Sequence, residues 1–189
     1  MTFLEGISPF VSETVETLTP PWISASLIVG ILIGLLNRKK NRVAAVAAAA
    51  SLSAYLMLIL GYAVALRVRQ PAPTLILTPF RTYAAWISGA EPNLFFEDFV
   101  NVVMTIPIGI CVPIIVRRRR LLAALCTTVI LELLIETAQY VFVRGVTEID
   151  DLINGVFGAL IGFGLYAAVA AIIRRFTIKN DPKESETHV

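Results

Sequence analysis

The sequence predicts an all-α integral membrane protein with five transmembrane helices and a short interfacial helix between the second and the third. Of its 189 residues, 57% are hydrophobic and only 16% are charged, whereas soluble domains usually carry about 25% charged residues. Five apolar stretches are long enough to cross a bilayer, and basic residues cluster in alternate connections between them. Both patterns are typical of a polytopic membrane protein.

The five apolar stretches define the predicted spans. A helix needs roughly 17 to 25 residues to cross the hydrocarbon core of a bilayer. The first stretch is the shortest, so its flanking residues have to contribute to the crossing. The stretches cover residues 22 to 36, 43 to 66, 99 to 116, 121 to 143 and 152 to 173.

The basic residues orient these spans. Twelve of the sixteen Lys and Arg residues fall in three clusters, at 38 to 42, 117 to 120 and 174 to 183, which five spans place on one side of the membrane. Because cytoplasmic segments carry the excess of Lys and Arg, we expect the N-terminus outside and the C-terminus in the cytoplasm. The chain then divides into a tail with two spans (1 to 66), a core (67 to 173) and a polar cytoplasmic tail (174 to 189).

The composition also excludes several kinds of chemistry. The single histidine, His188, lies in the polar tail, which rules out histidine-based acid-base or metal chemistry within the membrane. Cys111 and Cys126 both fall inside apolar stretches, where a thiol behaves as a small hydrophobe. The net charge of +2 gives no electrostatic reason to expect a nucleic-acid partner. The sequence identifies no cofactor and no oligomeric state.

The connection between the second and third spans contains an amphipathic segment. Residues 75 to 87 are too apolar for a freely solvated loop. Thr78 and Pro79 predict a helix start and Gly89 predicts its end, so we expect an interfacial helix over residues 79 to 88. This helix either roofs a cavity or anchors the protein in the aromatic belt of the membrane.

Polar residues inside the fourth span are the main functional signal. Glu132, Glu136 and Gln139 are spaced i, i+4 and i+7, which places them on one helix face. A charge near the centre of a span costs about 2.5 to 3.5 kcal/mol on insertion scales, so Glu132 must be protonated or paired. The three side chains either hold helices together by hydrogen bonds or form a functional site. Glu136 is the candidate general base if that site is catalytic.

Further polar residues gather toward the outer ends of the last three spans. Arg144 is the expected counter-ion, because a guanidinium neutralises a carboxylate or grips a phosphate. The candidate ligand-binding residues are Arg81, Asn101, Glu132, Glu136, Gln139, Arg144, Asp150, Asp151 and Asn154. Oxygen ligands also suit a divalent cation such as Ca²⁺ or Mg²⁺. The candidate ligands for such a cation are Glu97, Asp98, Asp150 and Asp151.

Several of these features recur together over residues 75 to 170. In chain order they are Pro79-Phe80-Arg81, Asn101, Pro107 with Gly109, Glu136 with Gln139, Arg144, Asp150-Asp151, Asn154, and Gly158 with Gly162. This segment resembles the VanZ-like family of bacterial membrane proteins, named for a member linked to resistance to the glycopeptide antibiotic teicoplanin. The family usually has an asparagine three residues before the first glycine of the GxxxG pair, where this chain has Gly155. The resemblance implies a cell-envelope role that alters the access of a glycopeptide to lipid-linked wall precursors.

Two functions follow as expectations. The leading one is a multi-pass protein of the bacterial plasma membrane whose outer-leaflet site binds a lipid-linked glycan, a lipid headgroup or a glycopeptide, contributing to teicoplanin resistance. The alternative is a membrane-embedded hydrolase or transferase that acts on a lipid phosphate with Glu136 as base and Arg144 on the phosphate. A transporter is disfavoured because five spans do not divide into matched halves. A structural or assembly role is a further alternative.

Overall fold

The computed structural model describes residues 42–65 and 67–179. The elements in chain order are α3 (Arg42–Leu60), the π-helix η1 (Gly61–Ala65), β1 (Leu75–Ile76), α4 (Arg81–Ile87), α5 (Leu94–Ile115), α6 (Arg120–Phe142), β2 (Thr147–Glu148) and α7 (Ile149–Lys179). The expected first span at residues 22 to 36 and the last ten residues of the polar tail lie outside the described residues.

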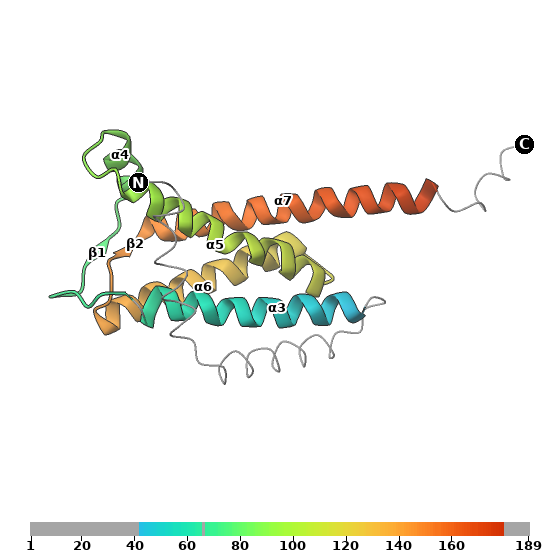
Figure 1. Cartoon of the computed structure of the whole chain (residues 1–189), viewed down its shortest axis with the longest axis horizontal. Coiled ribbons are helices and arrows are strands. Elements are labelled where there is room, and N and C mark those ends of the chain that lie inside the picture. The colour runs from blue at the N-terminus through green and yellow to red at the C-terminus, as the bar shows by residue number, and fades with distance from the viewer. Residues whose placement is uncertain (1–41, 66, 180–189) are drawn as a thin grey trace, which may run out of the picture.

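Four helices of the described part are long and apolar enough to cross a membrane, namely α3, α5, α6 and α7. They correspond to the second to fifth predicted spans. Figure 1 shows them as an elongated bundle in which α7 extends beyond its neighbours. A helix of 31 residues is about 46 Å long at 1.5 Å per residue, which exceeds the roughly 30 Å hydrocarbon core.

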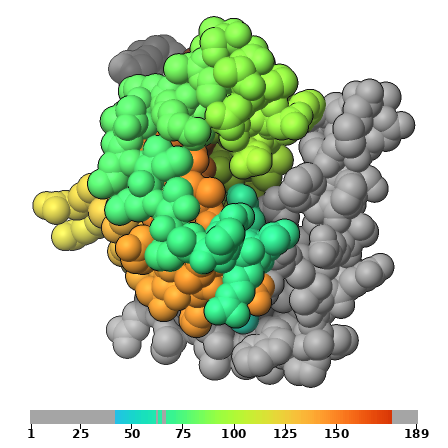
Figure 2. All heavy atoms as spheres, turned by 90° about the vertical axis from the view of Figure 1, so that its left-hand side faces the viewer, coloured from blue at the N-terminus to red at the C-terminus, as the bar shows by residue number. Residues whose placement is uncertain are grey.

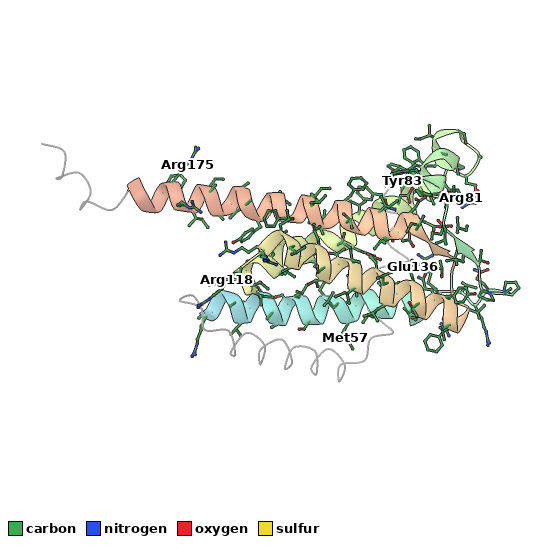
Figure 3. All side chains as sticks on the ribbon, turned by 180° about the vertical axis from the view of Figure 1, so that it is seen from behind. Met57, Arg81, Tyr83, Arg118, Glu136 and Arg175 are labelled. Atoms are coloured by element: carbon green, nitrogen blue, oxygen red, sulfur yellow. The ribbon has the colours of Figure 1, made fainter. Side chains whose placement is uncertain are left out.

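The two ends of the bundle differ in the residues they carry. Figure 3 shows Arg118 and Arg175 toward one end, and Arg81, Tyr83 and Glu136 toward the other. The second end also holds α4 and the two strands (Figure 1). Figure 2 looks onto this end, where the green residues of the connection between α3 and α5 lie beside the orange residues near position 150. We call it the strand end.

The described chain is mostly helical, as predicted, but β1 and β2 also form a short parallel sheet that the sequence did not predict. Leu75 pairs with Thr147, and Ile76 pairs with Glu148. An isolated bridge between Arg69 and Arg144 continues the contact. The connection after α3 therefore lies along the connection after α6. Two residues per strand are too few to give an alternating pattern that sequence could reveal.

Two predicted helix boundaries also need correction. The helix α4 begins at Arg81, and its N-cap is Phe80 in a left-handed conformation (φ 61°), so Thr78 and Pro79 do not form its cap. Its end agrees with the prediction, since Gly89 has φ +76° just beyond it. Asp150 and Asp151, expected in the connection after the fourth span, lie in the first turn of α7.

The helices α5 and α7 pack with their backbones in contact through glycines. A Cβ atom at Gly158 would lie 2.0 Å from the carbonyl oxygen of Val102, and one at Gly162 would lie 2.1 Å from that of Ile106. Gly109 of α5 has the same property toward α7. The GxxxG pair of the sequence therefore serves helix packing, as expected for small residues in membrane helices.

The apolar core of the bundle lies between α3, α5 and α6. Its buried residues include Ile59, Ile108, Leu131 and Ile135. Many large apolar side chains point outward instead, as expected where lipid replaces water. The core thus holds three helices together, and the glycine contact attaches α7 to α5.

Replacement of Gly162 by leucine should destabilise this contact severely. Overpacking usually costs about 1 to 3 kcal/mol, and a backbone oxygen cannot move aside as a side chain can, so we expect a loss of about 3 kcal/mol or more. Gly164→Leu is the matched control, since a Cβ atom there meets nothing within 4 Å. Thermal unfolding of the detergent-solubilised variants measures both effects. Equal midpoints for the two variants would contradict the glycine contact.

Candidate functional site at the strand end

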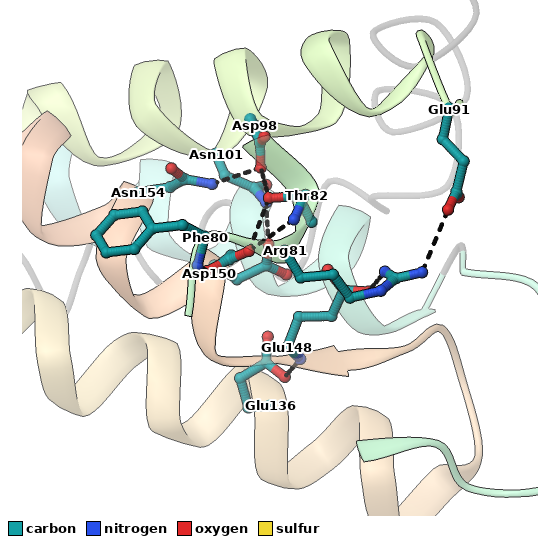
Figure 4. A network of polar contacts seen from close by, with 11 residues as sticks. Phe80, Arg81, Thr82, Glu91, Asp98, Asn101, Glu136, Glu148, Asp150 and Asn154 are labelled. Carbon is teal, nitrogen blue, oxygen red and sulfur yellow. Dashed lines mark hydrogen bonds and ion pairs between the residues drawn. The ribbon is translucent and has the colours of Figure 1, made fainter. Parts of the chain in front are cut away.

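Asp150 fixes the start of α4 from another helix. Its carboxylate is 1% exposed and accepts the backbone N–H of Phe80 (2.5 Å), the backbone N–H of Thr82 (2.9 Å) and the Thr82 hydroxyl (2.8 Å). The first N–H groups of a helix need acceptors, and Phe80 at the N-cap has no side-chain oxygen to supply one. Asp150 supplies it from the first turn of α7, which ties α4 to the bundle (Figure 4).

Asp98 of α5 gathers three more donors beside Asp150. It accepts the Thr82 hydroxyl (3.0 Å), the Trp86 indole N–H (3.0 Å) and the Asn154 amide (2.8 Å). The Asn154 amide oxygen in turn accepts the Tyr83 hydroxyl. Thr82 has a single hydroxyl proton, so it donates to one of its two flanking carboxyl groups at a time. The contacts thereby join α4 to the N-terminal parts of α5 and α7 in one largely buried network.

A second line of contacts leads from α5 to α6. The Asn101 amide donates to Asp151 Oδ1 (2.6 Å), and the Asp151 carboxyl group lies within hydrogen-bonding reach of the Glu136 carboxyl group. Glu136 Oε2 accepts the backbone N–H of Glu148 (3.0 Å). Two ionised carboxylates this close repel each other, so a proton or a cation has to lie between Glu136 and Asp151.

Glu148 and Arg81 form an ion pair at the edge of this region. Arg81 Nη1 lies 3.4 Å from Glu148 Oε1, and Arg81 Nη2 lies 3.2 Å from Glu91 Oε1. Burial nevertheless raises the pKa of Glu148 to about 7, and the negative charge of Asp151 adds to this effect while Arg81 opposes it. The ion pair therefore does not offset the cost of burying this carboxylate among acids.

Glu132 lies one helical turn deeper than Glu136 and fits into a notch in α7. A Cβ atom at Gly155 would lie 2.6 Å from Glu132 Oε1. The missing side chain of Gly155 therefore makes room for the Glu132 carboxyl group, which is part of a residue only 5% exposed. Gln139 lies on the same face of α6, and its amide donates to the carbonyl of Ala63 (2.8 Å).

Several buried polar atoms in this region have no hydrogen-bond partner among residues 42–65 and 67–179. They include Glu136 Oε1, Gln139 Oε1 and Arg67 Nε. Gln139 and Arg67 both approach Gly145, at which a Cβ atom would lie 3.6 Å from each side chain. Arg144 donates to the Arg67 carbonyl (3.4 Å), and Arg81 makes an ion pair with Glu148.

A groove opens beside these carboxylates. Its volume is about 300 Å³, and its lining is mainly apolar, with Glu136 and Glu148 as its acidic residues. The walls come from β1, α6, β2 and the start of α7. The residues lining it are Leu75, Leu77, Leu133, Glu136, Thr137, Tyr140, Thr147, Glu148, Ile149 and Leu152. We call it the acidic groove.

The fold brings most of the predicted ligand-binding residues together. The contacts above connect Arg81, Asn101, Glu136, Asp150, Asp151 and Asn154, with Glu132, Gln139 and Arg144 on adjacent turns. Of the candidate cation ligands, Asp98 and Asp150 use their oxygens on protein donors, and Glu97 is exposed. Within the described ranges no group of three or more such side chains is arranged to hold a metal ion.

Some residues of the network carried no signal in the sequence. Thr82 lies between two aspartates, but a single threonine in a short helix looks like any surface residue. Tyr83 and Trp86 were expected only as apolar side chains, although each donates a hydrogen bond to the network. Glu148 was not among the candidate site residues, and its pairing with Arg81 depends on the unpredicted strands.

Asp150→Asn should release α4 from the bundle. The amide retains one acceptor oxygen and presents N–H groups to the backbone donors of Phe80 and Thr82, so we expect a loss of about 3 kcal/mol and faster proteolysis of residues 75–91. Glu91→Gln is the control, because its ion pair with Arg81 is exposed and such pairs contribute less than about 1 kcal/mol. Proteolysis that is unchanged in Asp150→Asn would contradict this role of Asp150.

Glu148 should make the protein less stable as the pH rises. Its pKa is about 7 in the folded protein against an ordinary 4.5, so the folded state holds the proton more tightly than the unfolded state does. The contribution of Glu148 to stability is therefore constant below about pH 4.5, falls between pH 4.5 and 7, and is constant again above. Unfolding midpoints of wild type and Glu148→Gln across pH 4 to 9 test this. An identical pH dependence of both proteins would contradict it.

Comparisons with known proteins identify a family for this chain. No curated protein matches the chain, and neither does any solved structure. Residues 50–173, which are more than half of the chain, match the VanZ/LLP1 family. The match includes α5, α6, the part of α7 up to residue 173 and every residue of the network described above. The chain therefore belongs to the VanZ/LLP1 family, and it is a multi-pass membrane protein.

Proposed function

We propose that this chain is a protein of the bacterial plasma membrane that binds the polar head of an amphiphile at the strand end. The ligand class comprises lipid-linked glycans, lipid headgroups and glycopeptides, and binding contributes to glycopeptide resistance of the teicoplanin type. The observation that carries the proposal is the acidic groove, where apolar walls meet the carboxyl groups of Glu136 and Glu148.

The walls of the acidic groove suit a hydrocarbon chain. Leu75 and Leu77 are 51% and 64% exposed, and Leu133 is 52% exposed. These side chains face outward from the bundle, where an isoprenoid or acyl chain from the surrounding bilayer reaches them laterally. A hydrocarbon chain in a bilayer is already out of water, so packing it against leucines adds no hydrophobic driving force. The specificity of binding therefore has to come from the polar end of the ligand.

The polar end of the groove suits hydrogen-bond donors. A carboxylate accepts hydrogen bonds and donates none, and pockets for small molecules combine apolar walls with a few such convergent groups. Hydroxyl groups of a glycan and N–H groups of a headgroup or a glycopeptide are donors of this kind. Retention of a lipid-linked wall precursor in the groove would change how much of it a glycopeptide can reach.

In the proposed topology, the strand end faces outside, five spans cross the plasma membrane, and the C-terminus is cytoplasmic. The basic residues of positions 117–120 and 174–175 at the opposite end support this orientation through the excess of Arg on cytoplasmic segments. The interfacial position of α4 is part of the same proposal. Its Trp86 stacks edge-on with Phe95 (5.3 Å between ring centres), a pairing suited to the headgroup layer.

Blocking the acidic groove should abolish resistance. We expect expression of the wild type in a sensitive host to raise the inhibitory concentration of teicoplanin, and Leu133→Trp and Glu136→Gln to remove most of that increase. Leu134→Trp is the matched control, since Leu134 is 59% exposed but lies outside the groove. Binding of lipid-linked precursor to the purified variants should follow the same order.

Three outcomes would count against the proposal. Unchanged susceptibility together with absent precursor binding by the wild type would remove it. Equal effects of Leu133→Trp and Leu134→Trp would show that the groove is not the site. Release of phosphate from a lipid phosphate by the wild type, and its loss in Glu136→Gln, would favour the membrane-enzyme alternative instead.

A further inference from the structure

The end of the bundle opposite the strand end carries positive charge on its surface. The Asp and Glu residues of the described ranges lie instead at the strand end or within one helical turn of its network, so none of them neutralises this charge. We call this end the arginine end. Its arginines are all exposed, and they are Arg42, Arg117, Arg118, Arg119, Arg120, Arg174 and Arg175.

Two groups of these arginines come together along α7. Arg120 at the start of α6 is held against α7, because its Nη1 donates to the Tyr166 hydroxyl (2.6 Å) and its guanidinium carbon lies 5.7 Å from the centre of the Tyr166 ring. Arg174 follows Tyr166 by about 12 Å along the same helix, at 1.5 Å per residue. Figure 3 shows Arg118 and Arg175 toward the same end. The connection between α5 and α6 therefore brings its arginines beside the part of α7 that ends in two more.

Exposed apolar side chains adjoin the arginines on both helices. Leu121 and Leu122 are 38% and 50% exposed at the start of α6, and Ile172 and Phe176 are 54% and 65% exposed on either side of the arginine pair of α7. An acidic protein or a nucleic acid would match the charge and leave these side chains uncovered. A partner that covers both kinds of group has a negatively charged head and hydrocarbon chains.

The chemistry of arginine identifies the head. A guanidinium group forms paired hydrogen bonds with phosphate oxygens, and it stays charged at any physiological pH. Clusters of basic residues directly beside membrane helices attract anionic lipids for this reason. A phosphodiester with no ammonium group of its own retains its full negative charge for the protein.

We propose that the arginine end binds an anionic phospholipid, whose phosphate lies between the α5–α6 connection and the end of α7 while its acyl chains lie along Leu122 and Ile172. This site is separate from the acidic groove and does not rest on the proposed function. The bound headgroup would also join α7 to its neighbours at this end, where α7 extends beyond them (Figure 1).

The test compares two phospholipids with identical acyl chains for binding to the full-length protein by native mass spectrometry. Phosphatidylglycerol has a net negative charge, whereas phosphatidylcholine has the same phosphate with a compensating ammonium. We expect phosphatidylglycerol to bind at least about tenfold more tightly, and Arg118→Gln and Arg175→Gln each to weaken its binding about fivefold. Arg175→Lys keeps the charge and should retain most of the binding.

Arg69→Gln is the matched control, because it removes the same charge from an exposed arginine at the strand end. It should leave phosphatidylglycerol binding unchanged. The substituted side chains are exposed, so the unfolding midpoints of all variants should equal that of the wild type. Binding of lipid-linked precursor should be the same in wild type and Arg175→Gln, which keeps this test independent of the acidic groove.

Three outcomes would overturn the inference. Equal binding of the two lipids would show that the arginines do not select a negative head. Equal losses in Arg69→Gln and Arg175→Gln would show that net charge, rather than the arginine end, attracts the lipid. Displacement of the lipid by similar concentrations of glycerol phosphate or polyglutamate would show that the acyl chains contribute nothing and would assign the surface to a soluble acidic partner.

Discussion

The close approach of α5 and α7 is the constraint on which the rest of the site depends. Gly109, Gly158 and Gly162 let the two backbones touch within the membrane, and the same face of α5 continues upward to Asn101 and Asp98. The backbone contacts at these glycines set how α5 and α7 are aligned along their axes. In this alignment Asn101 meets Asp151, and Asp98 meets Asn154. Apolar packing thereby positions polar groups at the end of the bundle.

The polar network solves one problem of buried charge and leaves another unsolved. Asp98 and Asp150 receive several donors each, so their burial is compensated in the way that protein interiors require. Glu136 receives one backbone N–H and otherwise faces acids. Asp98 and Asp150 therefore explain the position of α4, whereas Glu136 depends on the proton or cation that it shares with Asp151, and carboxyl groups in such surroundings are more common at functional sites.

The sequence predicted the four described membrane helices and the polar face of α6 because both depend on local periodicity. The spacing of Glu132, Glu136 and Gln139 places them on one face whatever surrounds the helix, and the structure buries all three. The pairing of β1 with β2 and the capping of α4 by Asp150 were not predictable, because each joins segments about 70 residues apart. Arg81 was a candidate ligand-binding residue, and its position beside Glu148 depends on the fold rather than on a local pattern of the sequence.

The notch at Gly155 has a consequence for how this site can change over evolution. The Glu132 carboxyl group occupies the volume that a side chain at position 155 would need, and the VanZ-like pattern usually has an asparagine at that position. The two positions therefore compete for one space between α6 and α7. A side chain at position 155 therefore requires the Glu132 carboxyl group to move out of the notch, whereas a shorter residue at position 132 would leave that space free.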